Sequence, residues 1–486
     1  MWATQTVQIP MSPRVEGHCV PGARRVKMGE HEMSRCIGRS TALMIGAVAS
    51  MAAFGVKPAD AADLGGNCCA DLEERIAELE ATAARKGNRK VSLTVSGLVN
   101  EVLNFWDDGR EKNAYQVTND HQRTRFRFLG NAKIDANWSA GYLLEIGVRG
   151  NNSALVDQNT SKAGQGLDVR HSAWWLQNKD LGRLTVGQTS PGTDGITEID
   201  TAGLGHASIP EVQNFIGGFL ARRPSDGNLS TLTYSRLTNR ETNPGEQTRF
   251  NVVRYDTPVL AGFIGTAAWG EDKMWDVALR WAGEGQGFKL AAGIGYAQWT
   301  DGNSNLIGCV NLRVANKLGG SDVNCSTLGL SASVKHSETG LFVTGAYGNK
   351  QDDNRSAVVA GAEKTDNFYH IKAGIQKNWF GPGNSTLWGE HENGDFGSSG
   401  INAAGIGAGL QSAASLGLAG NVSGFALNMW GIGFNQSIDA AAMDLYVLYR
   451  HFDYEVRTSA TGTSPGSITT GLNDFQHVVA GAIIRF

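Results

Sequence analysis

The chain has 486 residues and a formal net charge of -4, with 19% charged and 41% hydrophobic residues. This balance argues against a nucleic-acid partner held by a basic face. Glycine is abundant (63 residues) and proline scarce (11), and no linker follows the first ~90 residues, which argues against several domains on stiff spacers. Such a composition fits a soluble protein, and it fits a transmembrane β-barrel equally well, because half of each barrel strand is polar.

An export signal occupies residues 33–61. A basic segment at 33–39 is followed by an apolar run at 42–56 and by the A-x-A cleavage pattern at 59–61. We interpret Met33 as the true start and residues 1–32 as a mis-called extension. A transmembrane anchor is the alternative, but the run is shorter than the roughly 20 residues that a spanning helix needs.

A helical leader is predicted over residues 62–87, on the periplasmic side. Its apolar residues within 70–86 follow a 4-3-4 spacing: Leu72, Ile76, Leu79 and Ala83. About two heptads are marginal alone. An oligomerising coiled coil and a frayed helix packed on the body both stay open, as does the pairing of Cys68 and Cys69.

From residue 88 to Phe486 the apolar residues alternate with a period of two, which predicts an all-β domain. The strand candidates are 91–106, 122–136, 138–149, 168–179, 183–189, 249–257, 261–271, 275–283, 287–298, 327–337, 340–349, 367–379, 384–394, 425–437, 441–455 and 474–486. An even total of about sixteen puts both ends on one side of a barrel. We place a further pattern at 229–237 inside a loop, although eighteen strands stay possible.

Short and long connections alternate along this domain. Tight turns are predicted at 137, 180–182, 258–260, 284–286, 338–339, 380–383 and 439–440. The other connections are mostly longer: 107–120, 150–167, 299–326, 350–366, 395–424 and 456–473. Short turns on one side and long loops on the other are typical of an outer-membrane barrel.

Aromatic residues gather near the strand ends: Trp106, Trp138, Trp269, Trp275, Trp281, Trp299, Trp379, Phe380 and Phe486. Aromatic girdles at two membrane interfaces would produce this distribution. Between Trp275 and Trp281 the intervening Val277 and Leu279 predict a lipid-facing side, with Asp276 and Arg280 on the other.

Three arginines mark the second predicted strand. Arg123, Arg125 and Arg127 share one face of the strand, while Phe126 and Phe128 share the other. In a half-buried strand of a soluble protein the arginines would face outward into water. In a transmembrane barrel the faces reverse, and the arginines line a wet lumen.

About sixty residues separate the fifth predicted strand from Arg249, far more than an ordinary loop contains. This segment has acidic residues at Asp194, Glu198, Asp200 and Glu211. It also has apolar anchors: Ile196, Ile199, Leu204, Ile209, Val212, Phe215, Ile216, Phe219 and Leu220. The mixture favours a loop packed against the rest of the protein.

Cys309 and Cys325 lie in one loop between strand patterns. In an oxidising compartment they would form a disulfide, stabilising the fold by roughly 3 kcal/mol in the chain-entropy model. Two free thiols are the alternative.

Three motifs carry a resemblance over residues 88–486. They are Val186-Gly187-Gln188, the return strand at 253–258 leading into Gly262-Phe263, and the closing strand at 480–486 with its final Phe486. In this order the chain resembles the general diffusion porins of Gram-negative outer membranes, most closely the alphaproteobacterial family. The helical leader and the Gly/Ala-rich loop at 397–424 depart from that pattern.

The resemblance implies a sixteen-stranded transmembrane barrel in the outer membrane, assembled as a homotrimer. Its third external loop, residues 189–247, would fold inward so that Asp194, Glu198, Asp200 and Glu211 face the arginines across a constriction. Phe486 would be the signal for the barrel-assembly machinery. The implied partners are outer-membrane lipid and the small hydrophilic solutes and ions that diffuse through.

Enzyme chemistry is not indicated by the sequence. His171-Ser172, His206 and His391-Glu392 stand in no nucleophile-elbow or metalloprotease motif, and no glycine loop predicts a bound phosphate. We therefore expect no catalytic residue, cofactor or metal. The leading hypothesis is a passive channel. An adhesin or receptor acting through its external loops, and an outer-membrane hydrolase, are the alternatives.

Overall fold

The structure, a computed structural model, describes residues 90–237, 245–246, 248–301, 309, 323–355, 362–397, 413–418, 421–459 and 467–486. The predictions for residues 1–32, 33–61 and 62–87, including Cys68 and Cys69, lie outside these ranges. Within them, no helix is both long and apolar enough to cross a membrane.

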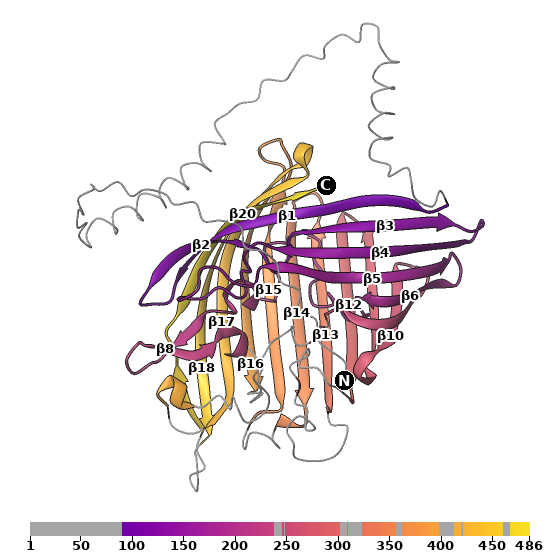
Figure 1. Cartoon of the computed structure of the whole chain (residues 1–486). Coiled ribbons are helices and arrows are strands. Elements are labelled where there is room, and N and C mark those ends of the chain that lie inside the picture. Colours follow the sequence, from indigo (N-terminus) through magenta and orange to yellow (C-terminus); the bar gives the residue numbers. More distant parts are fainter. Residues whose placement is uncertain are drawn as a thin grey trace, which may run out of the picture. The chain divides into compact units, whose positions relative to one another are not determined.

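The fold is one antiparallel sheet that closes on itself (Figure 1). Its strands are β1 (Ser92–Asp107), β2 (Lys112–Thr118), β3 (Arg125–Lys133), β4 (Trp138–Arg149), β5 (Gly166–Asn178), β6 (Gly182–Thr189), β9 (Phe250–Asp256), β10 (Phe263–Gly270), β11 (Trp275–Gly285), β12 (Phe288–Trp299), β13 (Cys325–His336), β14 (Leu341–Asp352), β15 (Thr365–Lys377), β16 (Ser385–Gly397), β17 (Asn421–Ile438), β18 (Met443–Ser459), β19 (Ser467–Gly471) and β20 (Phe475–Arg485). Closure comes from β1, which pairs with β2 and β3 on one edge and with β20 on the other.

Two pairs of short strands each make up one stave of the barrel. β2 and β3 lie end to end along β1, and β19 and β20 lie end to end along β18. The eighteen strands of the sheet therefore form sixteen staves, which confirms the predicted barrel. The pattern at 229–237 includes β8 (Leu229–Thr233), which pairs with β7 (Leu220–Arg222) in a separate two-stranded sheet, so it adds no stave.

The strands place apolar side chains on the outside of the barrel and polar or ionic side chains on the inside. On β11, Trp275, Val277 and Leu279 are 38%, 45% and 45% exposed, whereas Asp276 between them is 1% exposed. The same alternation on β17 and β18 leaves Ile432 outside and buries Arg450 inside. An apolar exterior with ionic groups inside is the arrangement of a barrel that spans a lipid bilayer.

The short turns use the backbone conformations that tight hairpins need. Between β11 and β12 only Gln286 and Gly287 connect the strands, with φ of +52° and +81°. Positive φ at both central residues is the type I′ geometry, whose twist matches that of paired strands.

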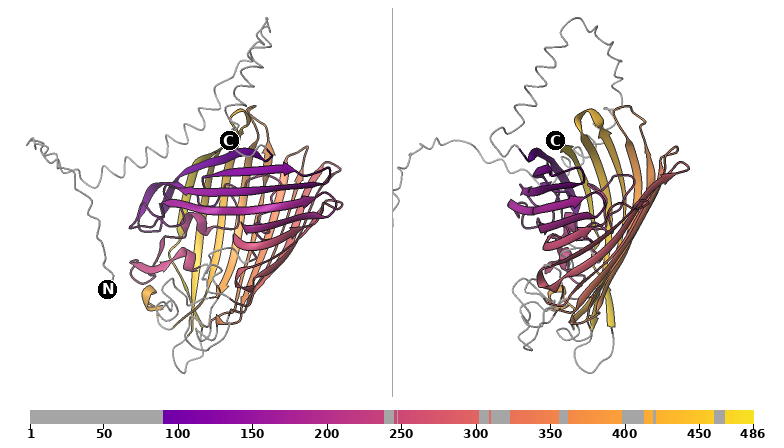
Figure 2. Two further views of the ribbon diagram at one scale, coloured as in Figure 1. Left: turned by 45° about the vertical axis from the view of Figure 1, so that its right-hand side comes forward. Right: turned by 90° about the vertical axis from the view of Figure 1, so that its right-hand side faces the viewer.

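The long connection between β6 and β9 lies inside the barrel. It contains β7, β8 and two single-turn helices, α3 (Gln213–Ile216) and α4 (Tyr234–Leu237). Phe219 packs against Trp106 of β1 and Phe475 of β20, each with ring centroids 5.1 Å apart. In Figure 2 these magenta elements lie beside the yellow strands. The apolar anchors from Ile196 to Phe219 are buried, apart from the half-buried Ile199, which confirms a packed loop.

Candidate functional site

Glycines on the inner face of β12 and β13 let the first limb of the inward loop approach the wall. A Cβ at Gly293 would lie 2.6 Å from Cδ1 of Ile199, and one at Gly329 would lie 2.5 Å from the carbonyl oxygen of Gly245. The wall also holds this limb by hydrogen bonds, for example from the Ser331 hydroxyl to the carbonyl oxygen of Ile196 at 2.6 Å. Glycine within a strand often marks such a close approach of another backbone.

A buried set of ionic groups holds the second limb. Lys372 Nζ of β15 donates to Oδ2 of Asp200 and to the carbonyl oxygen of Ser208, both at 2.9 Å. Arg450 Nε of β18 donates to Oε1 of Glu390 at 2.6 Å, and the Ser208 hydroxyl donates to Glu390. Burial alone would raise the pKa of Asp200, but the Lys372 ammonium holds that pKa below its ordinary value. Asp200 therefore anchors the loop to this wall.

The predicted arginines lie on the opposite inner wall, across β3, β4 and β5. Glu145 of β4 accepts from Arg125 at 3.4 Å, from Arg127 Nε at 2.9 Å and from Arg170 Nε at 2.7 Å. Arg123, just before β3, pairs with Asp168 at 3.0 Å. Three guanidinium groups around one carboxylate leave an excess of two positive charges at this wall.

Arg170 is missed by sequence reasoning because of a β-bulge. The register between β4 and β5 shifts between Glu145 and Ile146, which leaves Arg170 without a paired residue. Both Arg170 and His171 then contact Glu145, while Val169 and Trp174 on either side are each 52% exposed. Simple alternation would put Arg170 outside with Trp174. The bulge turns it inward instead.

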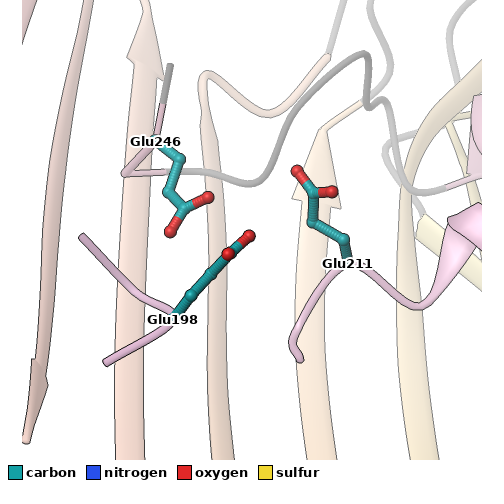
Figure 3. A group of neighbouring side chains, drawn as sticks. All are labelled: Glu198, Glu211 and Glu246. Carbon is teal, nitrogen blue, oxygen red and sulfur yellow. The ribbon is translucent and has the colours of Figure 1, made fainter. Parts of the chain in front are cut away.

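Three carboxylates meet on the inward loop. Oxygens of Glu198, Glu211 and Glu246 lie within 4.8 Å of one another, and Figure 3 shows Glu198 and Glu246 pointing toward each other. Burial and the neighbouring Glu211 raise the pKa of Glu246 to about 8, and burial with Glu246 raises that of Glu198 well above its usual range. Carboxylates are ligands of hard divalent cations, but the raised pKa values of Glu198 and Glu246 keep these two protonated at neutral pH and weaken the group as a cation site.

Arg249, at the end of the loop, connects the two charged regions. Its Nη2 atom lies 3.4 Å from Oδ2 of Asp194. Burial opposes its charge, but the carboxylates of Asp194 and Glu145 raise the pKa of Arg249 above its ordinary value. It therefore interacts with the arginine wall and with the loop acids at once. Neither Arg249 nor Glu246 belongs to a motif that singles it out in the sequence.

The structure thus divides the predicted acids among three settings. Asp194 pairs with Arg249, Asp200 anchors the loop, and Glu198 and Glu211 join Glu246. Within the described ranges, Asp194, Glu198 and Asp200 make no ion pair with Arg123, Arg125 or Arg127. The arginines are instead paired with acids of the wall itself, chiefly Glu145. Its position between Leu144 and Ile146 in an alternating strand is a signal that could have identified it.

The remaining predicted residues lie at the two ends of the barrel. Cys309 and Cys325 form a disulfide, which confirms that prediction, in a buried apolar cluster with Trp299 and Val323. Phe486 pairs through its backbone with Gly97 of β1, and its side chain is 65% exposed.

The sixteen-stave barrel with a loop packed inside is the fold of Gram-negative outer-membrane porins. The chain is similar to an anion-selective porin from Comamonas acidovorans, with 14% identity and a TM-score of 0.50 over 82% of this chain and 100% of that one. It is also similar to OmpT of Vibrio cholerae in its trimer form, with 12% identity and a TM-score of 0.47 over 82% of this chain and 99% of that one. The channel DcaP of Acinetobacter baumannii is similar as well, with 13% identity and a TM-score of 0.44 over 83% of this chain and 100% of that one.

No protein-family model and no curated protein sequence is matched. The fold and the apolar exterior assign the chain to a Gram-negative outer membrane. The narrower resemblance to the alphaproteobacterial porins stays a prediction.

Proposed function

We propose that this protein is a passive channel for small hydrophilic solutes and ions. The observation that carries the proposal is the arginine wall, whose ionic side chains face inward and yet keep contact with solvent. The side chain of Arg127 is 41% exposed and that of Arg149 is 21% exposed. A barrel filled by a plug would bury these groups, as the loop buries Glu390 on β16 and Arg450 on β18.

Selection would occur between the arginine wall and the carboxylates of Glu198, Glu211 and Glu246. The excess positive charge of the arginine wall creates a transverse field across a narrow aqueous gap, which low-dielectric walls focus. A solute must align its dipole with that field, so small hydrophilic molecules pass and apolar molecules are disfavoured. The size of the gap and the charge on the three glutamates would set the limits.

A homotrimer is the proposed assembly, and the exterior of β1 supports it. Glu101 shares the outward face with Val99 and Leu103 and is paired in register with Ala482 of β20. Its carboxylate accepts from the Gln116 amide at 2.7 Å and from the Thr118 hydroxyl at 2.9 Å. A carboxylate within an apolar belt is unfavourable against lipid, so contact with another protomer would explain its position.

Purified protein in a planar bilayer tests the proposal. A water-filled channel gives ohmic conductance steps, whereas an adhesin, a receptor or an enzyme in a filled barrel would be nearly silent. The species that resists dissociation in detergent without boiling should carry the conductance. Silence of that species would contradict the channel and favour the adhesin hypothesis.

A further inference from the structure

Next to the arginines, the inner wall carries apolar side chains in the lumen. Leu129 is paired in register with Leu143, as Arg127 is with Glu145, and alternation puts all four on the same face. The next residue in the Leu129 row is Ala173 of β5. This row lies one step from the arginines toward the end of the barrel where β1 begins.

These leucines differ from apolar residues elsewhere on the inner face. Leu129 is 39% exposed and Leu143 is half-buried. On β18 and β20, Leu448 and Val479 also point inward, but the loop covers them and both are 0% exposed. Apolar surface left in contact with water is unfavourable, so the row at Leu129 gains stability when an apolar group covers it.

The arginine beside this row has hydrogen-bonding capacity to spare. Arg127 donates to Glu145 through Nε and Nη2, and across the described part of the chain Nη1 makes no hydrogen bond. Arg125 and Arg170 share the same carboxylate partner, so the local charge stays positive. A planar guanidinium group recognises a carboxylate by paired N–H donors.

We propose that Arg127, Leu129 and Leu143 form a binding site for organic monoanions that join a carboxylate to an aromatic or branched apolar group. The carboxylate contacts Arg127, and the apolar group covers the two leucines. Ligand sites are usually lined by apolar side chains together with a few well-placed polar groups. This inference rests on the proposed channel, because the ligand reaches the site through the lumen.

Benzoate is the probe, with acetate and benzyl alcohol as controls for the carboxylate alone and the ring alone. We expect benzoate to reduce the single-channel current at about tenfold lower concentration than either control, since discrimination by a few methylene-sized contacts is of that order. Equal effects of benzoate and acetate would overturn the site.

Two substitutions and a conservative control assign the effect to these residues. Leu129→Asn should remove the preference for benzoate over acetate, while Leu129→Met, which keeps the volume, should retain it. Arg127→Gln should remove the preference for benzoate over benzyl alcohol. The open conductance in potassium chloride reports folding of each variant. A conducting Leu129→Asn variant with an unchanged preference would contradict the inference, whereas no conductance from wild type would contradict the channel itself.

Discussion

Two regions of the inner wall of the barrel carry similar charged residues, but these residues have different roles. On β16 and β18, Glu390 and Arg450 form an ion pair, with 5% and 1% exposure, beneath the inward loop. On β3, β4 and β5, three arginines share Glu145, and Arg127 keeps 41% of its side chain exposed. The sheet is the same. What differs is the cover: the wall beneath the loop carries paired charges that anchor it, and the wall with excess positive charge is the one that we propose to contact the solute.

The largest effect is expected from breaking the anchoring wall. Glu390→Ala leaves Arg450 buried without its carboxylate, and removal of one partner from such a pair costs about 3–5 kcal/mol of the free energy of unfolding. Urea unfolding in lipid vesicles measures the loss. Glu284→Ala is the matched control, because its partner Lys289 is 46% exposed and surface pairs contribute at most about 1 kcal/mol. Equal losses in the two variants would remove the distinction between anchored and open pairs.

A smaller loss of stability is expected where the loop packs directly against glycine backbone of the wall. Gly329→Val introduces atoms 2.5 Å from the carbonyl oxygen of Gly245, and such overpacking costs about 1–3 kcal/mol. Gly345→Val is the control, since a Cβ there meets nothing within 4 Å. The free energy of unfolding and the single-channel conductance should both change in Gly329→Val, and neither should change in Gly345→Val. Identical behaviour would mean that the loop is not seated on this wall.

On the arginine wall the effect should be on selectivity. Replacing Arg123, Arg125 and Arg127 together with Gln removes the excess positive charge, and the permeability ratio should move toward cations by about tenfold, the lower end of what focused fields achieve. The reversal potential in a salt gradient measures it. The control replaces the exposed Lys112, Lys162 and Lys179 with Gln. An unchanged reversal potential in the arginine variant would place these residues outside the constriction.

The smallest effect is expected from pH. The pKa of Glu246 is raised to about 8, so an increase in pH from 6 to 10 should ionise it and shift selectivity toward cations, with a midpoint near that pKa. Because the folded-state pKa lies above the ordinary value of 4.5, its contribution to stability is present below pH 4.5 and is lost as pH rises to about 8.

Glu246→Gln should abolish the midpoint, and Glu284→Gln near the end of β11 should not. A midpoint that survives in Glu246→Gln would mean that another group titrates in the lumen.

The sequence predicts the barrel well because the alternation recurs in sixteen predicted strands, and short turns and long loops recur between them. It fails where a local feature breaks the period. The sequence pattern places β2 and β19 in loops, because each continues a stave after an interruption that resembles the end of a strand. The bulge at Arg170 reverses the face of one residue, and alternation cannot show it.

The site is less predictable, because its pairings depend on how the loop turns inside the barrel. Residue type and strand parity place Arg125 and Arg127 on the inner face. Nothing in the order of Asp194, Glu198, Asp200 and Glu211 indicates that one pairs with Arg249, one anchors the loop and two meet Glu246. Those contacts join residues separated by tens to hundreds of positions, and only the packed structure brings them together.

The most direct test is the accessibility of the arginine wall to water within the open channel. Arg127→Cys, in a protein whose Cys68 and Cys69 are replaced by serine, should react with a charged methanethiosulfonate added to either side of a planar bilayer, and the single-channel current should fall as it reacts. Leu144→Cys, on the lipid-facing side of the neighbouring strand, should not respond. A current that the reagent leaves unchanged at position 127 would contradict a lumen bordered by these arginines.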